Sequence, residues 1–129
     1  MALVAESKVR NVTPVAYEFN IRARLSEDIS GAGTQLVYTG VITDGVPVMS
    51  KAPTTGITEA DGISLEKGSA GDVIDVGISG ELDGFTGMTP GAKLYPSTTS
   101  AGRLDTTAIA NAVVRVKAHS ATRIRFHYV

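Results

Sequence analysis

The chain of 129 residues contains no cysteine and no tryptophan, and aromatic residues make up only 5% of it. Without cysteine there are no disulfides, thiolate nucleophiles or cysteine-ligated metals. Stability must therefore come from packing or from partners. Scarce aromatic rings also leave little basis for the stacking platforms that bind single-stranded nucleic acid, so we expect no nucleic-acid partner.

A large excess of charge of one sign is also missing. Twelve Lys and Arg residues stand against thirteen Asp and Glu residues, for a net charge of −1, whereas non-specific nucleic-acid binders are usually strongly basic. No apolar run approaches the roughly 20 residues that span a bilayer, and no secretory leader pattern opens the chain. We expect a protein made in the cytoplasm, without a membrane partner, that folds as one domain.

Residue patterns typical of catalysis or metal binding are absent as well. The two histidines, His119 and His127, lack metal-ligand spacing, and the sequence has no nucleophile elbow and no phosphate-binding glycine loop. The acidic residues between Asp72 and Asp83 lack the spacing of a calcium-binding loop. The sequence therefore predicts surface histidines, no catalytic, cofactor or metal site, and no enzymatic activity.

One stretch imitates an enzyme motif. The string Gly71–Val76, followed by Gly80 and Glu81, resembles the strand motif of trimeric dUTP pyrophosphatases, in which the aspartate acts as a base. The serines and arginines that hold the triphosphate in that family have no counterpart here. Of three candidate functions, an enzyme of this kind ranks third. Asp75 is predicted to face outward from a half-buried strand.

Alternation of apolar and polar residues predicts strands with one buried face. In the clearest strand, Phe126 is predicted to lie in the core and Arg125 outside, and the preceding strand is close enough to form an antiparallel hairpin with it. The only helical candidate is Thr106–Ala112 with Asp105 as N-cap, and a single turn or an irregular loop fits it equally well. The predicted strands cover residues 20–25, 35–43, 62–66, 72–79, 112–118 and 123–128.

The first part of the chain has apolar residues without a clean period, and Pro14 forbids a continuous helix through it. We predict an extended N-terminal arm over residues 1–19 and a single β domain over residues 20–129. The fold class is predicted to be all-β, as a small β-barrel or β-sandwich. The arm is too apolar to be a solvated tail. Its candidate contact residues are Leu3, Val4, Val9, Val12, Pro14 and Val15.

Charge is distributed in blocks along the chain. Residues 1–24 hold four basic and two acidic groups, residues 25–81 two basic and nine acidic, and residues 82–129 six basic and two acidic. The blocks are either solvated faces of strands, or complementary surfaces that meet a partner or the next subunit of an oligomer.

A series of glycine-containing strings fills the second half of the chain. The order of these strings resembles that of the small head-decoration, or capsid cement, proteins of tailed bacteriophages. Its most telling part is the turn Thr89-Pro90-Gly91, in which proline presets φ and glycine is free to take a positive φ. The matching strings are Gly56–Ala60, Ala70–Val76, Gly84–Tyr95, Ala101–Thr107 and Val113–Thr122.

The resemblance implies a structural virion protein on the capsid exterior, made in the host cytoplasm. Its partner would be the major capsid protein, and its role would be to stabilise contacts between capsomers. It also implies self-association, as a homotrimer or alternatively a dimer, so that weak contacts add. The alternative function is a receptor- or glycan-binding β module of a virion tail or cell surface, for which the tyrosines are too scattered to define a site. They are Tyr17, Tyr38, Tyr95 and Tyr128.

Overall fold

The computed structural model describes residues 14–42, 44–57 and 59–128, and these residues form strands and turns with no helix. The all-β class predicted from the alternating pattern is confirmed. The strands are β1 (Pro14–Leu25), β2 (Gln35–Val41), β3 (Pro47–Lys51), β4 (Gly62–Ser64), β5 (Val73–Leu82), β6 (Lys93–Pro96), β7 (Leu104–Asp105), β8 (Val116–Ala118) and β9 (Ile124–His127).

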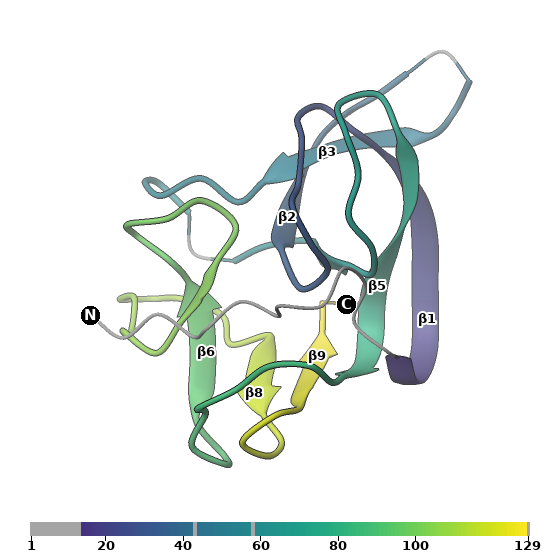
Figure 1. Cartoon of the computed structure of the whole chain (residues 1–129). Coiled ribbons are helices and arrows are strands. Elements are labelled where there is room, and N and C mark those ends of the chain that lie inside the picture. Colours follow the sequence, from purple (N-terminus) through teal and green to yellow (C-terminus); the bar gives the residue numbers. More distant parts are fainter. Residues whose placement is uncertain (1–13, 43, 58, 129) are drawn as a thin grey trace.

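Strands β1, β3, β2, β4 and β5 hydrogen-bond in this order, and β1 also pairs with β5, so they close into a small barrel (Figure 1). The β1–β5 pairing is antiparallel and runs from Pro14 opposite Leu82 to Arg24 opposite Val73. The β1–β3 pairing is parallel and short. Closure of the sheet is the arrangement that removes exposed strand edges. Of the two predicted architectures, the barrel is the one observed.

Strand β5 also carries the C-terminal part of the protein. One edge of β5 pairs with β1, while the other edge is divided between β4 at Val76–Gly77 and β9 at Ser79–Leu82. From β9 the order continues through β8 and β6 to β7. We call β6, β8 and β9 the C-terminal sheet; Figure 1 shows it at the opposite end of the molecule from β3. The barrel and the C-terminal sheet therefore share β5.

Two hydrophobic cores follow from this arrangement. The half-buried Ile21 packs against both cores and joins them. The barrel core consists of Ala23, Leu25, Ile29, Leu36, Met49, Ile74 and Val76. The larger core extends under the C-terminal sheet and includes Ile63, Ile78, Leu82, Phe85, Leu94, Val116, Ile124, Phe126 and Tyr128.

The predicted hairpin near the C-terminus is confirmed. Strands β8 and β9 pair antiparallel, with Lys117 opposite Arg125. Phe126 is buried and Arg125 is exposed, as their alternation predicts. The helical candidate forms turns instead: Asp105 Oδ1 accepts a hydrogen bond from the Thr107 amide at 2.8 Å, but Asn111, with a φ of +64°, interrupts any continuing helix.

Residues 14–19 of the predicted arm lie in strand β1. Strand β1 begins at Pro14, so Pro14 and Val15 lie within it, and Pro14, Ala16 and Tyr17 are already in register with β5. Proline is tolerated at the first position of a strand, and the register shifts along this part of β1 explain why no period of two is visible there. The remaining candidate arm residues, Leu3, Val4, Val9 and Val12, lie outside the described residues.

Candidate functional site

The turn Thr89-Pro90-Gly91 has the geometry that its sequence predicts. The Ala92 amide donates to the Thr89 carbonyl at 3.1 Å, and Gly91 has a φ of +84°. A positive φ at the third residue after Pro at the second is typical of a type II turn. The three turn residues are exposed, so this turn is a surface feature and contributes nothing to the core.

The neighbouring hairpin fixes this turn in place. The Gly91 amide donates to the Ala118 carbonyl at 2.7 Å, and the amides of Phe85 and Met88 donate to carbonyls of the β8–β9 turn. The side chains of Phe85 and Met88 are buried in the larger core. The segment before β6 and the β8–β9 turn therefore form one rigid end of the molecule, visible at the bottom of Figure 1.

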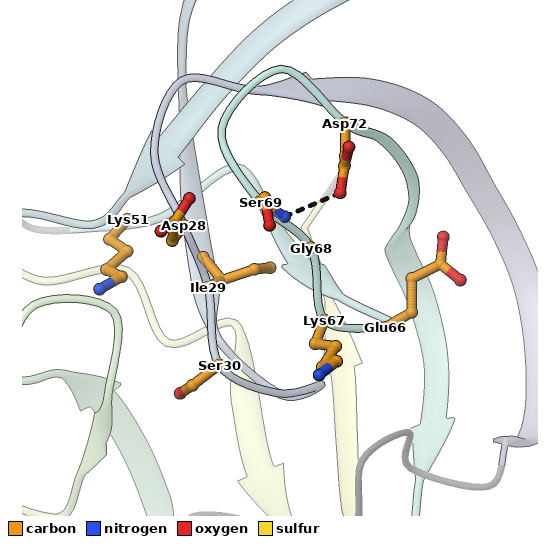
Figure 2. A pocket seen from close by; sticks show the side chains of 9 residues that line it. All are labelled: Asp28, Ile29, Ser30, Lys51, Glu66, Lys67, Gly68, Ser69 and Asp72. Atoms are coloured by element: carbon orange, nitrogen blue, oxygen red, sulfur yellow. Dashed lines mark hydrogen bonds between the residues drawn. The ribbon is translucent and has the colours of Figure 1, made fainter.

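A cleft of about 900 Å³ lies between the loop that follows β1 and the loop that precedes β5 (Figure 2). Its lining is polar and carries both signs of charge, and none of the lining residues is aromatic. Three carboxylates and two ammonium groups line this cleft. The lining residues are Asp28, Ile29, Ser30, Lys51, Glu66, Lys67, Gly68, Ser69 and Asp72.

The carboxylates of this cleft hold its loops together. Asp28 Oδ1 accepts a hydrogen bond from the Ala70 amide at 2.7 Å. Asp72 Oδ2 accepts one from the Ser69 amide at 2.8 Å, drawn as the dashed line in Figure 2. Carboxylates bound to backbone amides are typical of loop-stabilising groups. The two loops thus determine the shape of the cleft, and their stabilising carboxylates supply its negative charge.

The orientation predicted for Asp75 is confirmed. Asp75 faces outward from the barrel, where its Oδ1 lies 3.1 Å from Nη1 of Arg22 in an exposed ion pair. His119 and His127 are exposed on the β8–β9 hairpin, also as predicted. Across the described ranges, no group of three or more His, Asp or Glu side chains is placed to hold a metal ion.

The charge blocks of the sequence meet within one chain, an arrangement that neither interpretation of the blocks predicted. Most ion pairs join a basic residue of the first or last block to an acidic residue of the middle block. These pairs lie at the surface and are partly or largely exposed, and such pairs each contribute little stability. They are Arg22–Asp75, Arg24–Asp44, Arg115–Glu59, Arg123–Glu81 and Arg125–Glu81, with N–O distances between 2.8 and 3.8 Å.

One of these pairs belongs to a turn. The amide of Val46 donates to Asp44 Oδ1 at 3.1 Å, and Arg24 Nη2 lies 3.0 Å from Asp44 Oδ2. First the Val46 amide and then the Arg24 guanidinium favour the carboxylate, and together they hold the pKa of Asp44 below its usual value. This turn therefore links the β2–β3 connection to β1.

Comparison with models of known protein families gives no match for this chain, and a search of curated proteins also gives none. The residues that the structure describes include no helix that could cross a membrane. The likeness to decoration proteins therefore rests on the sequence strings between residues 56 and 122.

Proposed function

We propose that this protein is a head-decoration, or cement, protein that binds the outer surface of an assembled phage capsid through the major capsid protein. The observation that carries the proposal is the turn Thr89-Pro90-Gly91. It is the most telling string of the resemblance, and it forms an exposed turn of the expected geometry on a rigid support. An all-β barrel domain is also what the resemblance implies.

A cement protein acts by binding and needs no chemistry. Several copies around a symmetry axis grip neighbouring capsid subunits together, so that individually weak contacts add. In the proposal, Leu3, Val4, Val9 and Val12 form an apolar segment that is buried against the capsid or a neighbouring copy. Strand β1 begins at Pro14 and would anchor that segment to the barrel.

We propose a homotrimer on the capsid, with a dimer as the alternative. The charge blocks give this no support, because their opposite charges pair within the chain. The trimer rests instead on multivalency and on the three-fold positions that decoration proteins of this type occupy. A reconstruction of decorated capsids, counting the copies around each axis, tests the number directly.

The test of the function is co-sedimentation with empty, expanded capsids assembled from the major capsid protein encoded in the same genome. Saturable binding to expanded capsids, together with greater resistance of the capsids to heat, is expected. Binding to a glycan array without binding to capsids would contradict the proposal and favour the receptor-binding alternative. The described tyrosines do not favour that alternative, because Tyr128 is buried while Tyr38 is half exposed on β2.

A further inference from the structure

Three basic side chains stand in register on the outer face of the C-terminal sheet. Lys93 on β6 is opposite Lys117 on β8, and Lys117 is opposite Arg125 on β9. All three are exposed, while residues next to them in sequence, such as Val116 and Phe126, are buried. The backbone pairing therefore fixes a row of cations that points away from the core. We call this row the cationic face.

Such a row is unfavourable in the isolated protein. Side chains opposite each other on antiparallel strands have Cβ atoms about 4.5–5.5 Å apart, and like charges at this spacing repel. The repulsion at Arg125 is reduced by Glu81, the residue opposite it on β5, whose Oε2 lies 3.4 Å from Nη2 of Arg125. Among the described residues, the side chains of Lys93 and Lys117 form no ion pair or hydrogen bond.

Most arginines of the described chain contrast with these two lysines. Arg22, Arg24, Arg115, Arg123 and Arg125 all pair with carboxylates of the same chain. The four described lysines form no such ion pair, but Lys51 and Lys67 lie in the cleft beside three carboxylates. Lys93 and Lys117, by contrast, lie opposite each other in register, so their unpaired positive charge is concentrated at one place on the C-terminal sheet.

A small hollow of about 160 Å³ adjoins the row and is lined in part by Val114, Lys117 and Arg125. Val113, the residue before Val114, has 45% of its surface exposed. A site that combines cations with an apolar surface suits a partner bearing carboxylates next to apolar side chains, as an acidic protein surface does.

Flanking charges argue against a polyphosphate partner. Glu59 Oε2 lies 2.8 Å from Nη2 of Arg115, which also lines the hollow. Glu81 on β5 lies at the end of the row, next to Arg125. These carboxylates would repel a nucleic-acid backbone, whereas a protein surface can answer both signs of charge. Phe126 and Tyr128 are also turned into the core and cannot stack on bases.

We propose that the cationic face docks onto an acidic patch of a partner protein. The identity of this partner rests on the proposed function, which makes it the outer surface of the major capsid protein. In the free protein, the repulsion between Lys93 and Lys117 raises the free energy. Docking would relieve this repulsion, and the free energy released would favour binding.

The experiment compares Lys117→Glu, and the double variant Lys93→Glu with Lys117→Glu, against Lys67→Glu as the matched control. Lys67 is an exposed lysine that lines the cleft of Figure 2, away from the cationic face. The Lys117→Glu substitution places a carboxylate opposite Arg125, so an attractive contact replaces a like-charge one and folding should not be impaired. Thermal unfolding of each variant checks this point.

Binding to expanded capsids is measured over a range of salt concentrations. We expect Lys117→Glu to weaken binding about tenfold or more and to flatten its salt dependence, with a larger loss for the double variant and about twofold or less for Lys67→Glu. If the wild-type chain binds capsids and Lys117→Glu binds equally well, the cationic face is not the docking surface, although the cement function stands.

A second arm separates failure of the function from failure of the docking surface. If the wild-type chain does not bind capsids, the proposed function is wrong, and the surface is then tested with poly-L-glutamate and with double-stranded DNA as probes. Binding of poly-L-glutamate that Lys117→Glu abolishes supports an acidic protein partner. Binding of DNA alone, binding of neither probe, or loss of self-association in Lys117→Glu would each overturn the inference.

Discussion

The ring of Phe126 packs directly on the backbone of Gly77. A Cβ atom built on Gly77 would lie 2.8 Å from both Cε2 and Cζ of that ring. Gly77 lies in β5 and Phe126 in β9, and Phe126 is the largest fully buried side chain of the described protein. The absence of a side chain at Gly77 thus leaves the space that the ring of Phe126 fills. This contact anchors the C-terminal sheet on β5.

Substitution of Gly77 by alanine should therefore destabilise the protein. The added methyl group must displace the ring of Phe126, and overpacking of this kind costs about 1–3 kcal/mol of unfolding free energy, measured by urea denaturation. Gly40→Ala is the matched control, because Gly40 is also in a strand and its Cβ would meet no atom within 4 Å. Equal losses from both substitutions would show that contact with Phe126 is not the cause.

The two faces of β9 should respond very differently to truncation. Phe126→Ala leaves a cavity in the larger core and should cost about 3–5 kcal/mol of unfolding free energy. Arg125→Ala removes an exposed ion pair with Glu81 and should cost less than about 1 kcal/mol. Chemical denaturation of both variants measures the difference, and comparable losses would mean that the assignment of faces is wrong.

Tyr128 should make the protein sensitive to alkaline pH. Burial raises the pKa of its hydroxyl, which donates to Gln35 Oε1 at 3.2 Å in the core. Because the folded state holds the phenol neutral, this contribution to stability is complete below the ordinary tyrosine pKa of about 10 and falls as the pH rises above it. Tyr128→Phe should lose part of the alkaline decrease in melting temperature.

Tyr38→Phe is the control for this measurement, since Tyr38 is half exposed and the substitution leaves Tyr128 in place. It should keep the full alkaline decrease. At neutral pH, Tyr128→Phe should cost about 1 kcal/mol for the lost hydrogen bond. An alkaline decrease of equal size in the two variants would contradict a role for Tyr128.

Removal of residues 1–13 should separate folding from capsid binding. The truncated chain begins where β1 begins, so every described strand remains whole. We expect its melting temperature to stay within a few degrees of that of the full chain, while its capsid affinity falls about tenfold or more through the loss of apolar contact. Equal capsid affinity of the two chains would exclude an arm that contributes to binding.

Regular alternation made several strands predictable. The buried positions of β8 and β9 follow directly from their period of two, because a strand with one buried face exposes every second side chain. In β5 the alternation holds only as far as Val76, and residues 76–80 are all buried. Strand β3 was missed, since it is short and begins at Pro47. The first half of β1 was missed because its register shifts remove the period, and because Pro14 is more often a sign of irregular structure than of a strand.

Relationships between strands could not be predicted. The sequence shows the blocks of charge, but the pairing of Arg22 with Asp75 depends on closure of β1 against β5. The cationic face depends in the same way on the register between β6, β8 and β9, which no local pattern determines. The Thr89-Pro90-Gly91 turn was predictable because its geometry is encoded in three adjacent residues.

The division of β5 between two sheets has a consequence for the synthesis of the protein on the ribosome. When β5 emerges, β1 to β4 are already available, so the barrel core can assemble early. The half of β5 that receives β9 must wait, with apolar groups such as Leu82 uncovered, until β6, β7 and β8 have also been synthesised. Such long-range pairing slows folding and leaves an aggregation-prone edge in the interval. The nascent chain therefore has a vulnerable stage, and a chaperone that shields β5 during that stage should raise the yield of folded protein.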